Sequence, residues 1–103
     1  MKHFLIRYRL NNETAEAWHH DIATFISALQ GDGVLRSGIF YRCMKVRDGI
    51  DYYHLASAVD DRAIKTLQER DFFKRYTERT KLVAGGEVEV LPLEVVAETL
   101  GPQ

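Results

Sequence analysis

Hydrophobic and polar residues alternate along residues 2–10 of the chain, with a period of two. This period is typical of a β-strand that buries one of its faces. The two alternating sets are Phe4, Ile6, Tyr8 and Leu10 on one side, and His3, Leu5, Arg7 and Arg9 on the other. The first set is plainly the more apolar, so we expect it to face the helices of the domain.

The hydrophobic period then changes to three and four residues. Apolar residues at positions 18, 22, 25, 26 and 29 predict an amphipathic helix over residues 13–30. The preceding Asn-Asn-Glu-Thr can cap this helix, and Gly-Asp-Gly at 31–33 ends it. Residues 34–46 are rich in apolar and aromatic side chains and predict a second strand.

A hairpin follows, because Asp48-Gly49 suits a two-residue type I′ turn with positive φ at both positions. Residues 51–59 then return as a third strand. A turn of this length places Cys43 opposite His54. Residues opposed in this way share one face of a sheet.

Asp60 and Asp61 predict the start of a second helix, which breaks near Asp71 and continues through the aromatic segment 72–76. Gly-Gly at 85–86 ends it, and residues 87–98 predict a last strand, placed at a sheet edge because Pro92 cannot donate a hydrogen bond. The order β-α-β-β-α-β predicts a ferredoxin-like α+β fold with a four-stranded antiparallel sheet and central first and third strands. We expect one domain over residues 1–99 and a flexible tail over 100–103.

The two faces of the hairpin differ in bulk. One face carries Phe40, Arg42, Met44, Tyr53 and Leu55, and its bulk predicts that it joins the core under the helices. The opposite face would then gather His3, Arg7, Tyr41, Cys43, Tyr52 and His54. A second subunit could cover this face, and two such sheets packed together would enclose a cavity suited to a small ligand.

Charge and composition exclude several classes of function. The 103 residues carry 14 Lys+Arg against 15 Asp+Glu, which argues against nucleic-acid or membrane-surface binding. The lone Cys43 excludes an intrachain disulfide and favours a reducing compartment. The apolar stretch in the first ten residues is too short for a signal peptide or a spanning helix. We therefore expect a cytoplasmic protein. No spacing of His, Cys, Asp and Glu predicts a metal site, and we expect no cofactor.

The segment SAVDDRAIKTLQERDFFKRYTERT resembles the antibiotic-biosynthesis monooxygenase family of the dimeric α+β barrel superfamily. It repeats that family's third strand, acidic cap, helix and aromatic-plus-basic segment, here Phe73-Lys74-Arg75-Tyr76. The resemblance implies a homodimer of ferredoxin-like subunits. Several such proteins oxidise phenolic or quinol-type compounds with molecular oxygen and without metal or flavin, whereas relatives bind heme or isomerise lactones.

The chain departs from the family pattern at three positions. Ala58 stands where many members carry Trp late in the third strand, and Leu67 and Phe72 stand where His residues are common on the second helix. The resemblance implies that these positions border the ligand and that the substitutions enlarge or reshape its cavity.

Several candidate residues have two interpretations each. His54 is either a base or hydrogen-bond donor to a phenolic ligand, or an interfacial histidine satisfied by a neighbour. Arg7 either binds an anionic oxygen or forms a surface ion pair, and for Arg9 the ion pair is favoured. Tyr41 and Tyr52 either contact the ligand or pack in a dimer interface.

Two further residues border the expected site. Cys43 is expected to be a small buried hydrophobic residue rather than a reactive thiol. His3, at the start of the first strand, is expected at the rim.

The function expected from these observations is that of a cofactor-independent, monooxygenase-like enzyme. It would act on a small phenol- or quinol-type compound in a cavity between sheet and helices, with Arg7 and a tyrosine holding the substrate oxygen and His54 taking its proton. The alternative is a non-catalytic module of the same fold that binds a small apolar ligand or only dimerises. A weaker alternative is a heme-binding relative.

Overall fold

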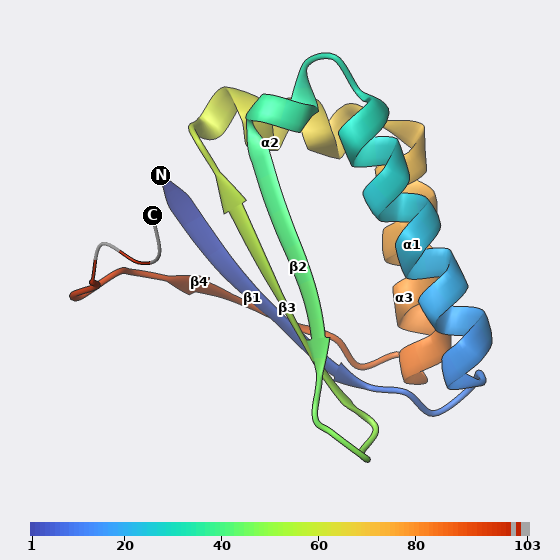
Figure 1. Ribbon diagram of the computed structural model, residues 1–103. Helices are drawn as coiled ribbons and strands as arrows, with labels where there is room; N and C mark the ends of the chain where they lie inside the picture. The colour runs from blue at the N-terminus through green and yellow to red at the C-terminus, as the bar shows by residue number, and fades with distance from the viewer. Residues whose placement is uncertain (100, 102–103) are drawn as a thin grey trace.

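The structure is a computed structural model that describes residues 1–99 and 101. Its elements are β1 (Lys2–Arg9), α1 (Ala15–Gly31), η1 (Leu35–Ser37), β2 (Ile39–Lys45), β3 (Asp51–Ala58), α2 (Asp61–Glu69), α3 (Asp71–Ala84) and β4 (Glu89–Leu93). The four strands form one antiparallel sheet in the order β2-β3-β1-β4. The helices lie together on one side of this sheet, and none of the elements formed by the described residues covers the other side (Figure 1). The ferredoxin-like arrangement with central β1 and β3 is confirmed.

The hairpin register expected from the sequence is confirmed, although the conformation of its turn is not. Cys43 lies opposite His54, and Tyr41 lies opposite Ala56. The expected type I′ turn is wrong. It needs a positive φ at both central residues, but only Asp48 has one, of 59°. Residues 47–50 instead form a loop, which the backbone hydrogen bond from Val46 N to Asp51 O closes at 2.8 Å.

Local chemistry fixes the ends of the helices. The side chain of Thr14 accepts a hydrogen bond from Ala17 N at the start of α1, and that of Asp60 does so from Ala63 N at the start of α2. Gly85 ends α3 in the left-handed conformation, with φ of 79°, which glycine adopts without steric cost.

Two strand boundaries differ from the prediction. Residues 35–37 form a 3₁₀ turn rather than part of β2, because the Asp32 side chain accepts from Val34 N and Leu35 N and curls the chain. β4 ends at Leu93, and residues 94–98 form no strand. Pro92 lies in an edge strand as expected. The tail expected over 100–103 falls, apart from Gly101, outside the described residues.

The expected assignment of the hairpin faces is wrong. In the pairing of β1 with β3, Ile6 lies opposite His54 and Tyr8 lies opposite Tyr52, so all four share the face that the helices cover. Tyr52 and His54 are 2 % and 0 % exposed. The register of β1 against β3 decides which face of the hairpin lies under the helices, and the sequence of the hairpin alone does not determine that register.

The opposite face of the sheet is open and apolar. We call it the open face, and its apolar residues are Leu5, Phe40, Met44, Tyr53, Leu55, Leu91 and Leu93. Phe40 is half exposed, and Leu55 and Leu93 are also exposed. Bulky side chains therefore gathered on the uncovered side, which is why bulk failed to identify the core. A search of the described residues found no helix long and apolar enough to span a membrane.

Candidate functional site

A cavity of about 280 Å³ lies between the sheet and helices α2 and α3. Its walls are mostly apolar, and Ile6, Ala58, Ile64, Leu67 and Phe73 are among the residues that line them. The exposed lining residues Gln68, Lys81 and Val90 lie at its mouth. An apolar cavity with a few polar groups at fixed positions is typical of a small-ligand site.

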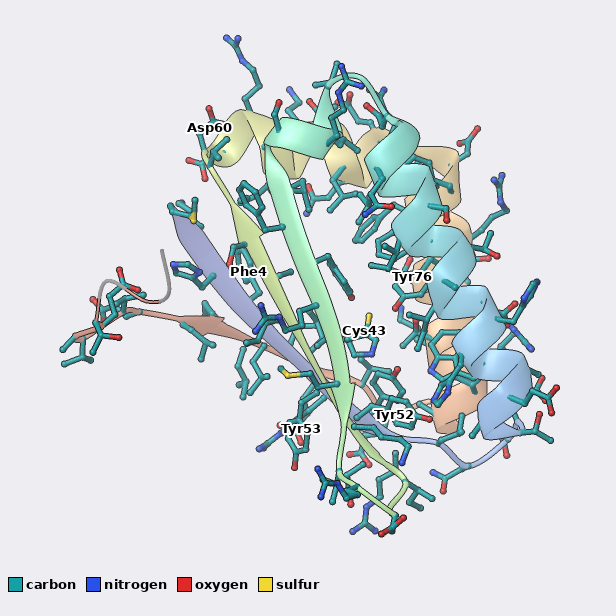
Figure 2. All side chains as sticks on the ribbon, viewed as in Figure 1. Phe4, Cys43, Tyr52, Tyr53, Asp60 and Tyr76 are labelled. Carbon is teal, nitrogen blue, oxygen red and sulfur yellow. The ribbon has the colours of Figure 1, made fainter. Side chains whose placement is uncertain are left out.

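Tyr41 and Tyr76 line this cavity, and their hydroxyls connect its wall to His54. Tyr41 Oη lies 3.1 Å from His54 Nδ1, and Tyr76 Oη lies 3.3 Å from the same nitrogen. Both tyrosines line the cavity. Figure 2 shows Tyr76 of α3 between the helices and the sheet, and Tyr53 on the opposite, open face. The cavity thus has a polar end made by two phenol groups in front of one buried imidazole.

Stacking fixes the ring of Tyr76. It lies parallel to the ring of Phe25, with centroids 3.8 Å apart, and nearly parallel to Trp18 at 5.7 Å. The ring of Tyr41 meets Phe25 edge to face at 5.0 Å. Because aromatic packing on this scale excludes alternative rotamers, the two hydroxyls are held in place before any ligand arrives.

A direction can be assigned to the hydrogen bonds behind the tyrosines. Trp18 Nε1–H, which can only donate, lies 2.8 Å from Tyr8 Oη. Tyr8 Oη in turn lies 2.8 Å from His54 Nε2, the acceptor within its reach. Because the Tyr8 hydroxyl still has its own proton to donate, we assign it as the donor to Nε2, which places the proton of neutral His54 on Nδ1. Nδ1–H then donates to a hydroxyl oxygen, of which that of Tyr41 lies nearest.

This direction makes the polar end of the cavity a hydrogen-bond donor. The hydroxyl hydrogens of Tyr41 and Tyr76 cannot bond to Nδ1, since that nitrogen already carries a proton. They are left for each other, for the nearby Cys43 sulfur and for whatever enters the cavity that both residues line. A ligand that brings an acceptor oxygen to this end completes the network.

Burial sets the ionisation states in the network. It lowers the pKa of His54 from 6.5 to about 4, so the imidazole is neutral at neutral pH. Burial raises the pKa values of Tyr8, Tyr41 and Tyr76 above the usual range of a phenol. All four groups therefore stay uncharged and act by hydrogen bonding.

Two of the expected ligand residues lie in this network but outside the cavity wall. Tyr52 stacks on Tyr8 at 5.2 Å, and its hydroxyl lies 2.7 Å from His19 Nε2. Cys43 is half-buried, with its sulfur 3.7 Å from His54 Nδ1. Burial raises the pKa of its thiol to about 11, which agrees with an unreactive cysteine.

The three positions where the chain departs from the family pattern lie around the cavity or close to it. Ala58 and Leu67 line it, and Phe72 packs against Phe25 with ring centroids 6.1 Å apart. His3 lies on the uncovered side of the sheet, where its Nδ1 is 2.7 Å from the Ser57 hydroxyl.

The expectation that Arg7 and His54 converge in one cavity is wrong. Arg7 lies opposite Tyr53 on the open face, where its Nη2 and Nε donate to the same oxygen, Oε2 of Glu89, at 2.8 and 3.1 Å. An open depression of about 470 Å³ beside these residues is larger than the cavity. Its arginines are already neutralised, because Arg9 pairs with Asp51 at 2.9 Å. We therefore take the smaller, apolar cavity as the candidate site.

Sequence reasoning missed three residues of the site. Tyr8, Trp18 and Tyr76 lie on the apolar stripes of β1, α1 and α3, and were counted as core. Each carries a polar atom that needs a partner when buried. The sequence feature that could have identified them is that three aromatic residues with polar atoms, and one histidine, lie on the apolar faces of elements that pack together.

Two observations bear on metal ions and on heme ligation by His54. In the part of the chain that the structure describes, no three His, Cys, Asp or Glu side chains gather in a metal-binding arrangement. His54 offers heme iron no free imidazole nitrogen, because both of its ring nitrogens are in hydrogen bonds.

Comparisons with known proteins agree with the fold. No protein family and no curated protein matches the sequence. Among solved structures, SnoaB, a cofactor-independent oxygenase from Streptomyces nogalater, has a TM-score of 0.76 at 14 % identity, over 98 % of this chain and 97 % of that one. An antibiotic biosynthesis monooxygenase has a TM-score of 0.76 at 9 % identity, over 94 % and 100 %. Rv0793 from Mycobacterium tuberculosis has a TM-score of 0.75 at 13 % identity, over 94 % and 96 %.

These similarities confirm the resemblance at the level of the fold. The chain has the α+β fold of antibiotic-biosynthesis-monooxygenase-like proteins over nearly its whole length. At identities this low, shared architecture does not transfer an activity or a substrate.

Proposed function

We propose that the protein is a cofactor-independent, monooxygenase-like enzyme that converts a small phenol-type compound to a quinone in the cavity under α2 and α3. The observation that carries this proposal is the pair of tyrosines, Tyr41 and Tyr76, that line an apolar cavity and whose hydroxyls lie beside the buried His54. A volume of about 280 Å³ suits a one- or two-ring compound.

The proposed reaction needs no reductant besides the substrate. The bound phenol loses its proton to solvent, one electron passes from the phenolate to dioxygen, and the two radicals combine to form a carbon–oxygen bond at the ring carbon para to the phenolate oxygen. The O–O bond then breaks, and the hydrogen of that carbon leaves with the departing oxygen as hydroxide. The first proton converts hydroxide to water, so one phenol and one O₂ give one quinone and one water.

The residues of the site promote this reaction through hydrogen bonding. Tyr41 and Tyr76 donate to the phenolate oxygen and stabilise the electron-rich form of the ring, in surroundings where such bonds are strong. The apolar walls exclude water from the oxygen adduct. We assign His54 a positioning role in place of the expected role as base, because burial disfavours its charged form and its proton already faces the tyrosines.

The test measures turnover of 1-naphthol in air. The proposal predicts 1,4-naphthoquinone as product, one O₂ consumed for each quinone, and one oxygen-18 atom in each quinone made under oxygen-18 gas. The double variant Tyr41→Phe, Tyr76→Phe should lose about 100-fold in turnover, the usual loss on removing hydrogen-bond donors to a developing oxyanion. Tyr53→Phe, which removes a hydroxyl from the open face, is the matched control and should retain activity.

A second candidate function is ligand binding without chemistry. It is favoured by the absence of a free basic nitrogen at the polar end of the cavity, since both nitrogens of His54 are engaged. The two functions separate in one experiment. Binding of 1-naphthol that is recovered unchanged after long aeration would support binding alone and exclude the oxygenase.

We also propose that a second copy of the chain covers the open face, so that two sheets pack into a barrel. The support is the row of exposed apolar side chains there, including Phe40, Tyr53 and Leu55, which is unusual for a surface that stays in water. This dimer is a different one from that expected from the sequence, which used the face of His54. We place the protein in the cytoplasm, in keeping with its single cysteine.

A further inference from the structure

Lys81 is an exposed residue that lines the same cavity as Tyr41 and Tyr76. The residues of α3 that line the cavity are Phe73, Tyr76, Thr77, Thr80 and Lys81. Their spacing of three and four residues places them on one face of the helix. Lys81 is exposed whereas Tyr76 and Thr80 are buried, so this face leads from the closed end of the cavity out to solvent.

Among the described residues, the ammonium of Lys81 has no ion-pair partner. Within residues 1–99 and 101, ion pairs engage Lys2, Arg7, Arg9, Arg70 and Arg79, and none engages Lys81. The acidic side chains nearest along the chain are Glu78 and Glu87, which form no ion pair with it, and Glu89 is held by Arg7. The long apolar stem of lysine lets its charge reach over an apolar rim.

We propose that Lys81 is a specificity-determining residue that binds an anionic substituent, such as a carboxylate, on the outer end of the ligand. This inference rests on the proposed function for the ring and its inner oxygen. The ligand class is then a flat ring system with an acceptor oxygen at one end and an anion at the other. Tyr76 and Lys81 start five residues apart on α3, about 7.5 Å along the axis, a span that two fused rings with a substituent at each end can bridge.

The ligand pair that tests this is 6-hydroxy-2-naphthoic acid and the corresponding amide. The two have nearly the same shape and differ in charge at the outer end. The acid should bind about five times more tightly than the amide at low salt, as expected for a partly exposed ion pair, and the preference should shrink as salt is added. Lys81→Met, which keeps most of the stem, should reduce the ratio of the two affinities to about one.

The matched control is Lys74→Met. Lys74 is also an exposed lysine of α3, but it does not line the cavity, so its loss should leave the preference for the acid unchanged. A preference that survives in Lys81→Met, or that disappears equally in Lys74→Met, would overturn the assignment.

Binding of 2-naphthol, measured alongside, separates this inference from the proposed function. If 2-naphthol binds and the acid has no advantage over the amide, Lys81 has no such role and the proposed cavity stands. If neither 2-naphthol nor the acid binds, the cavity is no ligand site and both proposals fail.

Discussion

The hydroxyl oxygen of Tyr8 lies 2.8 Å from Nε2 of His54, on the buried side of the sheet. The same oxygen accepts from Trp18 Nε1–H at 2.8 Å. One phenol group therefore satisfies two buried polar groups, and in the tautomer that we assign it leaves the imidazole proton on Nδ1. This relationship links β1, β3 and α1 and determines what the cavity can offer to a ligand.

Replacing Tyr8 with Phe should destabilise the protein by about 2–4 kcal/mol, because it leaves two buried groups, Trp18 Nε1–H and His54 Nε2, without partners. The measurement is urea unfolding. Tyr53→Phe, on the open face, is the control and should change stability by less than about 0.5 kcal/mol. Equal stability of the two variants would contradict the buried network.

The buried imidazole should make stability depend on pH between 6.5 and 4. The pKa of His54 is lowered to about 4 in the folded state, so across this range the unfolded chain binds a proton that the folded chain does not. Stability from this source is complete above pH 6.5 and is lost as the pH falls, by up to about 3 kcal/mol. Unfolding curves of the wild type and of His54→Gln should therefore converge or cross as the pH is lowered from 6.5 to 4. Parallel curves would show that His54 titrates normally.

Filling the cavity should abolish binding without unfolding the protein. Ala58 lines the cavity, so Ala58→Leu places its extra atoms in empty space and should cost less than about 1 kcal/mol while weakening naphthol binding more than tenfold. Ala63→Leu is the contrast. Ala63 lies outside the cavity, and its Cβ would be only 3.2 Å from a Cβ built on Gly38. A leucine at position 63 has no space there, so this variant should lose about 1–3 kcal/mol of folding stability. Calorimetric binding and thermal unfolding measure both effects.

A charge on the open face should break the proposed dimer. Leu55 lies on the central strand β3 and faces away from the helices, so Leu55→Asp would bury a carboxylate in the interface. Light scattering should report a dimer for the wild type and a monomer for this variant. Val34→Asp, at an exposed site before η1, should remain dimeric. A monomeric wild type would contradict the proposal.

Local patterns predicted most of the fold. Neighbouring residues alone predict the alternation in β1, the helical stripe of α1, the caps at Asp60 and Gly85 and the break near Asp71. The hairpin register was also predicted, because the observed loop over residues 47–50 is centred on the expected Asp48-Gly49 turn. The side of the sheet on which His54 lies was not predictable in this way. It depends on the register of β1 against β3, two strands brought together by distant parts of the chain.

The candidate site was predicted only in part, for the same reason. His54, Tyr41, Ala58 and Leu67 were identified, but the network that gives His54 a direction comes from three side chains on three other elements. Arg7 was assigned to the site because the sequence analysis grouped its face of β1 with the hairpin face that carries His54. Its ion pair with Glu89 was not predictable, because it depends on the pairing of β1 with the distant edge strand β4.

The most direct measurement is a crystal structure of the protein with 2-naphthol bound. The account predicts the ring between the sheet and helices α2 and α3, with its oxygen within hydrogen-bond distance of the hydroxyls of Tyr41 and Tyr76. A ring bound on the open face, or in the depression beside Arg7 and Arg9, would contradict it.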